Sequence, residues 1–179
     1  MKTKEMVSGA ILIAFSILIP VAFGAYLRIL IPPFSATIAS HVPVMLAMLV
    51  SPAIGAAVGV GSGVGFLMSY GADPLGIMIA ARAVSHSVWA YIGGLMIRRG
   101  KSFQKTLVVT SVMHAVLEVI VILILFLVFG IPLNQGTGVS STTLPTIAVV
   151  AIIFFGTIGH HAIDGLISLV IAKAVRASK

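Results

Sequence analysis

The sequence contains no cysteine and few charged residues. Asp, Glu, Lys and Arg make up only 8% of the 179 residues, and 59% are hydrophobic. Without thiols the chain can form no disulfide, no cysteine-based metal site and no thiolate nucleophile. A soluble domain carries about 25% charged residues, and a less charged chain cannot keep so much apolar surface in water. The composition therefore indicates an integral membrane protein.

Acidic residues are the scarcest charged type, with 4 Asp or Glu against 11 Lys or Arg and a formal net charge of +7. Such a balance suggests nucleic acid binding, but the positions of the charges argue against it. Nine basic residues stand in three clusters at the ends of apolar segments: Lys2 and Lys4; Arg98, Arg99, Lys101 and Lys105; Lys173, Arg176 and Lys179. Basic clusters of this kind mark the cytoplasmic ends of membrane helices. We therefore expect a lipid bilayer and no nucleic acid as partner.

Apolar segments of about 20 residues are long enough to cross a bilayer as helices. We expect six membrane helices, over about 5–23, 36–50, 53–70, 74–97, 105–129 and 145–175. The first could also be a signal peptide, but we interpret it as a membrane helix. Six crossings bring the three basic clusters to one side, so both termini are predicted to be cytoplasmic. The expected fold is an all-α integral membrane protein of the cell membrane, a single six-helix domain over 1–179.

The connections between these segments are rich in proline and glycine. The stretch 24–35 contains Pro32-Pro33, which cannot easily continue a helix, and is interpreted as an outer loop that partly re-enters or covers something. The segment 36–50 is short, and Pro43 predicts an irregular outer end. In 53–70, glycines recur every four residues, which favours close packing against neighbouring helices.

Two opposite charges lie inside the predicted membrane helices. At a rise of about 1.5 Å per residue, Arg82 is roughly 12 Å and Glu118 roughly 16 Å below the outer helix ends. Each charge alone would be costly in hydrocarbon, so we predict that they form a pair.

Other ionisable side chains lie near this depth. His86 and His114 are one turn below Arg82 and Glu118 on the same helix faces. His160 and His161 fall near the middle of the last helix, and Asp164 can orient one of them by a hydrogen bond. We expect Arg82, His86, His114, Glu118, His160 and His161 to contact a ligand, although histidines that only bond neighbouring helices are a common alternative.

The same histidines and carboxylates are residue types that bind Zn²⁺ or Ni²⁺. Because no motif fixes three ligands on one element, we expect no metal and no cofactor. The sequence also contains no nucleophile elbow, phosphate loop or paired catalytic carboxylates, so we do not expect an enzyme.

Small residues mark the first helix, where Ala10-x-x-x-Ala14 lets another helix pack closely. Together with six short helices, a proline-containing first outer loop and polar residues in the last three helices, this pattern resembles the S component of energy-coupling factor (ECF) vitamin transporters. The resemblance implies docking through Ala10 and Ala14 on a membrane-embedded T subunit that is coupled to two ABC-type ATPase subunits. It also implies an outward-facing vitamin pocket in the last three helices, closed by a lid loop that includes Pro32, Pro33 and Phe34.

The stretch from Ser40-His41 to Ser51-Pro52 is most similar to S components assigned to small pyridine or pyrimidine vitamins. The implied substrate is of niacin, pyridoxine or hydroxymethylpyrimidine type. Arg82 suits a carboxylate, whereas an Arg82 neutralised by Glu118 suits an uncharged ring alcohol. The alternative function is an autonomous proton-coupled small-molecule transporter or channel that uses the intramembrane His, Glu and Asp residues as a relay.

Overall fold

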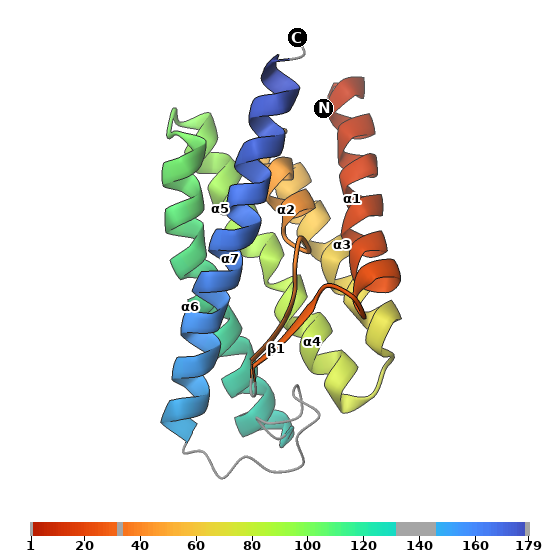
Figure 1. Ribbon diagram of the computed structural model, residues 1–179, viewed down its shortest axis with the longest axis vertical. Coiled ribbons are helices and arrows are strands. Elements are labelled where there is room, and N and C mark those ends of the chain that lie inside the picture. Colours follow the sequence, from red (N-terminus) through yellow and green to blue (C-terminus); the bar gives the residue numbers. More distant parts are fainter. Residues whose placement is uncertain (1, 32–33, 132–145, 178–179) are drawn as a thin grey trace.

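The computed structural model describes residues 2–31, 34–131 and 146–177 and shows a bundle of helices that run along its long axis (Figure 1). The elements, in chain order, are α1 (Thr3–Phe23), β1 (Arg28–Ile31), β2 (Phe34–Thr37), α2 (Val42–Met48), α3 (Pro52–Tyr70), α4 (Pro74–Val84), α5 (His86–Arg98), α6 (Phe103–Phe129) and α7 (Thr146–Ala177). Both termini lie at one end of the bundle, and the β1–β2 hairpin reaches toward the opposite end.

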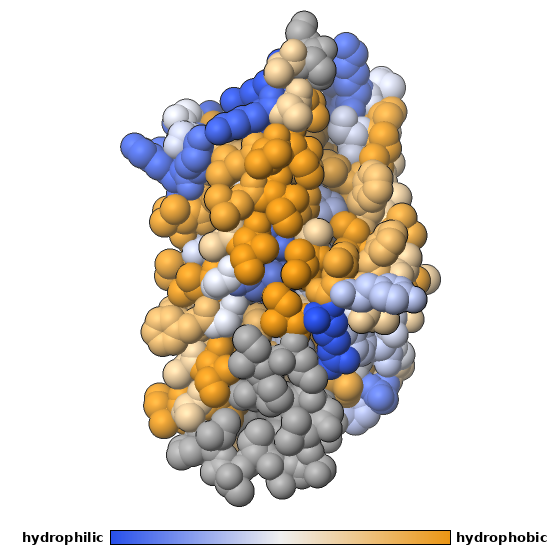
Figure 2. Space-filling view, in the orientation of Figure 1, coloured by the Kyte–Doolittle hydropathy of each residue, from blue (hydrophilic) through white to orange (hydrophobic). Residues whose placement is uncertain are grey.

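Five segments are long and apolar enough to cross a membrane, which confirms the multi-pass, all-α architecture predicted from the sequence. They are α1, α3, the segment Pro74–Arg98 that combines α4 and α5, α6, and α7. Apolar side chains dominate the middle of the face in Figure 2, and hydrophilic ones gather at the end that holds the termini.

The predicted helix over 36–50 is wrong in its extent. The first residues of this segment pair with β1 as an antiparallel strand, with Phe34 opposite Ile31 and Thr37 opposite Arg28. Helix α2 is only seven residues long, too short to cross a bilayer. It lies in the core instead, where Val44, Met45 and Ala47 are completely buried. The second of the six predicted helices is therefore a short buried helix that packs against α1, α3, α5 and α7.

The predicted helix over 74–97 is interrupted at Ser85. The hydroxyl of Ser85 donates to the carbonyl of Arg82 at 2.6 Å, and its backbone N–H donates to the same carbonyl at 3.1 Å. Serine side chains that bond the preceding turn bend helices. The bend separates α4, which carries Arg82, from α5, which carries His86.

The glycines of α3 pack closely against two different neighbours, as their spacing predicts. A methyl group added at Gly59 would lie 2.4 Å from the backbone nitrogen of Ser87 on α5. One added at Gly65, on another face, would lie 2.7 Å from Cα of Ile17 on α1. Helix α3 therefore holds the α4–α5 segment on one side and α1 on another.

Candidate substrate pocket and histidine cluster

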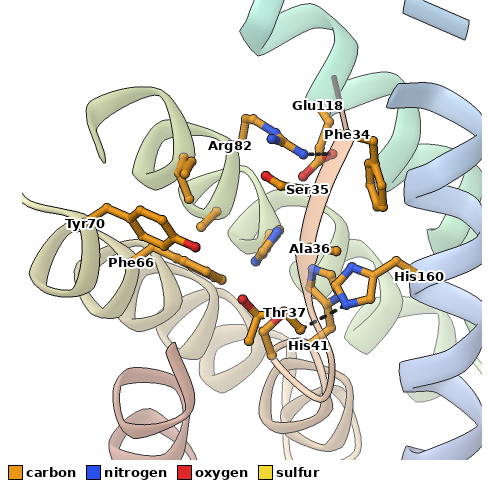
Figure 3. Close-up of a pocket in the computed structure, with 14 residues that line it drawn as sticks. Phe34, Ser35, Ala36, Thr37, His41, Phe66, Tyr70, Arg82, Glu118 and His160 are labelled. Atoms are coloured by element: carbon orange, nitrogen blue, oxygen red, sulfur yellow. Dashed lines mark hydrogen bonds and ion pairs between the residues drawn. The ribbon is translucent and has the colours of Figure 1, made fainter. Parts of the chain in front are cut away.

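A pocket opens between the hairpin and helices α3 to α7 (Figure 3). Its empty volume is about 420 Å³, including the part that is open to the outside. The lining residues are Phe34, Ser35, Ala36, Thr37, Ser40, His41, Phe66, Tyr70, Ile79, Arg82, Ala83, His86, Glu118 and His160.

Arg82 and Glu118 form an ion pair in the wall of this pocket, which confirms the pairing predicted from their depths. Nη2 of Arg82 lies 2.8 Å from Oε2 of Glu118, and the side chains are only 7% and 8% exposed. The hydroxyl of Thr157 on α7 donates to the same carboxylate oxygen. Nε of Arg82 is buried and has no hydrogen-bond partner among the described residues. The guanidinium therefore keeps one donor for a further acceptor.

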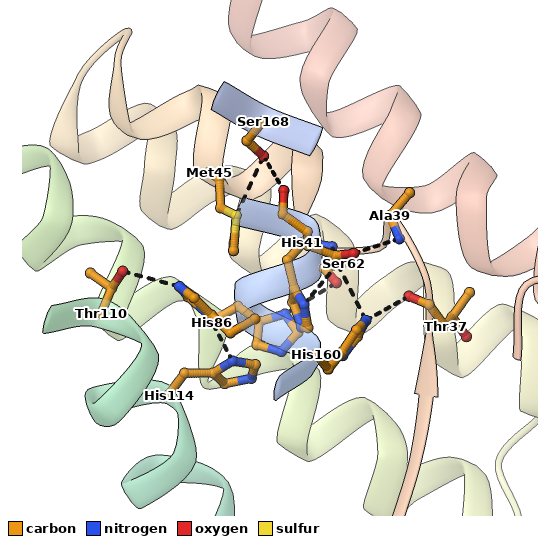
Figure 4. Close-up of polar contacts among 12 residues, drawn as sticks. Thr37, Ala39, His41, Met45, Ser62, His86, Thr110, His114, His160 and Ser168 are labelled. Atoms are coloured by element: carbon orange, nitrogen blue, oxygen red, sulfur yellow. Dashed lines mark hydrogen bonds and ion pairs between the residues drawn. The ribbon is translucent and has the colours of Figure 1, made fainter. Parts of the chain in front are cut away.

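All five histidines of the chain lie in one buried cluster beside the pocket (Figure 4). His41 is at its centre, with ring centroids of His86 and His114 at 4.6 Å and that of His160 at 4.4 Å. The ring of His161 is 5.4 Å from that of His114. Trp89, which is completely buried, closes the side formed by His86, His114 and His161.

Asp164 on α7 fixes the chain between β2 and α2. Its carboxylate accepts the backbone N–H of Ala39 at 2.8 Å and that of His41 at 3.0 Å. Ala39 has a φ of 68°, a left-handed conformation that is unfavourable for a residue other than glycine. Oδ2 of Asp164 also lies 3.0 Å from Nδ1 of His41 and 3.3 Å from Nε2 of His160. The carboxylate thus holds the backbone of the turn and orients two histidine rings.

The predicted binding residues fall into two groups in the structure. Arg82, His86, Glu118 and His160 line the pocket. His114 and His161 lie behind them, with their Nδ1 atoms 3.2 Å apart.

Of the two adjacent histidines on α7, His160 lines the pocket and His161 does not. His161 contacts the hydroxyl of Thr110 on α6 at 3.2 Å.

His41 lines the pocket although the sequence analysis did not select it. It was assigned to the irregular outer end of the segment 36–50. The sequence could have indicated His41 in one way. The chain has only five histidines, and the other four were all predicted to lie at membrane depth.

Residues of β2 line the pocket, and part of the predicted loop 24–35 forms strand β1; its role as a lid stays a prediction. Phe34 is 4% exposed and packs its ring edge toward His160, with the centroids 6.5 Å apart. Gly156 on α7 makes room for this ring, because a Cβ there would lie 2.7 Å from it. Pro32 and Pro33, the other two predicted lid residues, lie outside the described residues.

The predicted docking residues Ala10 and Ala14 are exposed on α1. The opposite face of the helix is buried through Gly9, Ser16 and Pro20, which leaves the alanine face open. Their docking role stays a prediction.

Comparison with known proteins finds no matching family model and no matching solved structure. The sequence is 30% identical over 142 residues to the niacin transporter NiaX of Lactococcus lactis subsp. cremoris (strain MG1363). The match covers 75% of this chain, and the chain spans 61% of the length of that relative. This similarity to a transporter and the membrane-helix architecture agree with the resemblance to S components of ECF vitamin transporters that the sequence pattern indicates.

Proposed function

We propose that the chain captures a small heterocyclic vitamin or precursor at the extracellular side of the cell membrane. The substrate is of niacin, pyridoxine or hydroxymethylpyrimidine type, and niacin fits the site best. Both termini and the three basic clusters are on the cytoplasmic side in this proposal, which places the hairpin on the outside. The similarity to a niacin transporter supports this substrate class.

The proposal rests on the hydrogen bonding of the Arg82 guanidinium. Its Nη2 is paired with Glu118, but its buried Nε has no partner among the described residues. Buried polar groups are nearly always hydrogen-bonded, so an unpaired donor in a pocket wall calls for a ligand acceptor. A carboxylate accepts from a guanidinium more strongly than a neutral oxygen does. The guanidinium can therefore bind the carboxylate of niacin without releasing Glu118.

Aromatic residues supply the second part of the site. Phe34 from the hairpin and Phe66 and Tyr70 from α3 line the pocket together with the charged pair. The rings of Phe66 and Tyr70 are stacked, with centroids 6.3 Å apart and planes 29° apart. A flat pyridine ring has suitable surfaces to stack against here.

The proposed partners are a transmembrane T subunit and two ABC-type ATPase subunits, which supply the energy for import. The chain would bind the vitamin with its pocket facing out and then topple within the T subunit to release it inward. Ala10 and Ala14 are the proposed contact with the T subunit, because they are exposed and small.

Equilibrium binding of radiolabelled nicotinic acid to the purified full-length chain tests the substrate. Nicotinamide, pyridoxine and hydroxymethylpyrimidine serve as competitors. We expect nicotinic acid to bind best and Arg82→Gln to weaken it by about 10- to 100-fold, as for a lost hydrogen bond to a charged group. The double variant R82Q/E118Q leaves no unpaired charge and should stay equally weak. Equal binding of nicotinamide, or normal binding by the double variant, would contradict the role of Arg82.

The buried histidine cluster also suits the rival function, a proton-coupled transporter that works alone. Reconstitution of the purified chain in liposomes separates the two functions. Vitamin uptake driven by a pH gradient, without other subunits, would support the rival. We expect binding without net uptake, and uptake only after a T subunit and ATPases are added with ATP.

A further inference from the structure

Three histidines from three different parts of the chain face one another below the vitamin pocket. His41 precedes α2, His86 begins α5 and His114 lies on α6. Their ring centroids are nearly equidistant, at 4.6, 4.6 and 4.8 Å, and their planes are 76° to 89° apart. One nitrogen from each ring can be chosen so that all three lie within 4.8 Å of one another.

The second observation is that one ring nitrogen of this trio lacks a partner. Nε2 of His86 is buried and has no hydrogen-bond partner among the described residues. Nε2 of His114 lies 3.4 Å from Oε1 of Glu118 but does not form a hydrogen bond with it. The two residues are 2% and 0% exposed. Unsatisfied buried polar atoms are rare and indicate a missing water or ion. The neutral imidazole nitrogen is also the commonest protein ligand for transition metals.

The Nδ1 atoms of the trio lie close to other polar groups. Nδ1 of His41 is 3.0 Å from the carboxylate of Asp164 without forming a hydrogen bond, and Nδ1 of His86 lies 3.3 Å from the hydroxyl of Ser62. Nδ1 of His114 lies 3.2 Å from His161. Histidine ligands usually bond a carboxylate or another polar group through the second ring nitrogen, which fixes the tautomer and the ring orientation.

We propose that His41, His86 and His114 bind a divalent transition-metal ion of the Zn²⁺ or Co²⁺ type beneath the vitamin pocket. Nitrogens on a tetrahedral zinc ion are about 3.3 Å apart, given bonds of about 2.0–2.1 Å. The rings therefore need to close by no more than about 1.5 Å between any two nitrogens. Three protein ligands leave a fourth position for water or a substrate atom. His41 and His86 also line the pocket, so the ion would lie next to a bound vitamin.

The charges around the trio are compatible with such an ion. Asp164 is the one carboxylate in the vicinity whose charge is not balanced by an arginine, since Glu118 is paired with Arg82. With neutral histidines the pocket region carries one net negative charge, and a divalent ion reverses its sign. A buried positive charge favours an anionic ligand in the pocket.

A second trio, His41, His160 and Asp164, also has its ligand atoms within 4.8 Å of one another. Ligand atoms of His160 and Asp164 already contact backbone groups, however. Nε2 of His160 contacts the carbonyl of Thr37 at 3.0 Å, and Asp164 accepts two backbone N–H groups. In this trio Asp164 orients His41, whereas His160 anchors the hairpin through the carbonyl of Thr37.

Metal binding is tested on the full-length chain in detergent, purified with a tag that contains no histidine and treated with a chelator. Co²⁺ is then added alone, and its visible absorption and the metal content per chain are measured. We expect one ion per chain in a tetrahedral environment with nitrogen ligands. H86Q and H114Q should each weaken binding by more than about 100-fold, beyond the 10- to 100-fold typical of residues that only support a ligand.

His160→Gln is the matched control, because it removes a histidine of the same cluster that does not belong to the proposed site. Its binding should stay within a few-fold of the unmodified chain, whereas D164N should weaken binding by about 10- to 100-fold through His41. Absence of a stoichiometric ion, or loss of binding in H160Q but not in H86Q and H114Q, would overturn the assignment.

X-ray absorption of the Zn²⁺-loaded unmodified chain needs no variant, so misfolding of a variant cannot affect the result. Three imidazole ligands at about 2.0–2.1 Å are expected, and a shell with fewer than three imidazoles would overturn the proposal. No vitamin is present in these measurements. Their failure would therefore leave the proposed vitamin binding intact, and failure of vitamin binding would leave the metal site intact.

Discussion

Asp164 and His41 are 123 residues apart in the sequence, yet the carboxylate of Asp164 accepts the backbone N–H of His41 at 3.0 Å and lies equally close to its ring. This contact joins α7 to the connection between the hairpin and α2. It sets the position of the hairpin over the pocket and the direction of the His41 ring at the same time.

Asp164→Asn tests this connection. The amide keeps one acceptor oxygen but turns the other into a donor, which opposes the backbone N–H of either Ala39 or His41. Loss of one hydrogen bond to a charged group should lower the free energy of unfolding by about 1.5–3 kcal/mol. Thermal denaturation in detergent measures the effect.

Asp73→Asn is the control for this substitution, because Asp73 caps α4 by accepting the N–H of Gly76 at 2.7 Å. Asn caps a helix about as well as Asp, so its effect should be small. Equal effects of the two substitutions would show that Asp164 has no special role.

The Arg82–Glu118 pair gives a prediction for stability as well as for binding. Removal of one partner of a buried ion pair leaves the other charge uncompensated and typically costs about 3–5 kcal/mol. Arg82→Met should therefore destabilise the chain more than the double variant R82M/E118L, in which two apolar side chains replace the pair. A chemical-denaturation series of the single and double variants measures this order. A double variant that is the least stable would contradict it.

Gly59 is predicted to tolerate no side chain. A Cβ at this position would lie 2.4 Å and 2.6 Å from backbone atoms of Ser87, and backbone cannot move aside as a flexible side chain can. Gly59→Ala should force α3 and α5 apart and destabilise the protein by about 1–3 kcal/mol.

Gly159→Ala is the matched control on α7, where nothing lies within 4 Å of the added Cβ. It should leave stability unchanged or raise it by about 0.5–1 kcal/mol, since alanine favours the helix. Thermal stability in detergent compares the two, and a G59A variant as stable as G159A would disprove the close packing.

The exposed alanines of α1 give a prediction for assembly. Ala10→Trp or Ala14→Trp adds a bulky ring to the face proposed to contact the T subunit, so co-purification with the T subunit and uptake should be lost. Vitamin binding by the isolated chain should be unchanged, because α1 contributes no residue to the pocket lining.

Val108→Trp on α6 is the control, at a site that is 68% exposed on another helix. This variant should assemble normally. Loss of vitamin binding in A10W or A14W, with assembly preserved, would refute the separate roles of α1 and the pocket.

The sequence alone determined the membrane class, the extents of the long helices and the Arg82–Glu118 pair. These follow from local rules: apolar length sets a span, basic clusters mark its ends, and a constant helical rise turns residue number into depth. An isolated charge in hydrocarbon is so costly that its partner can be sought among few candidates.

Only the tertiary structure revealed that residues 28–37 form a hairpin, that α2 is a short buried helix and that the five histidines converge. Residues 34–37 are strand because they pair with 28–31, and no periodicity within them reveals that partner. His160 and His161 share one depth but are about 100° apart around α7, so the packing of α7 decides which faces the pocket. The position of His41 depends on Asp164, a contact between distant parts of the chain that only the complete fold creates.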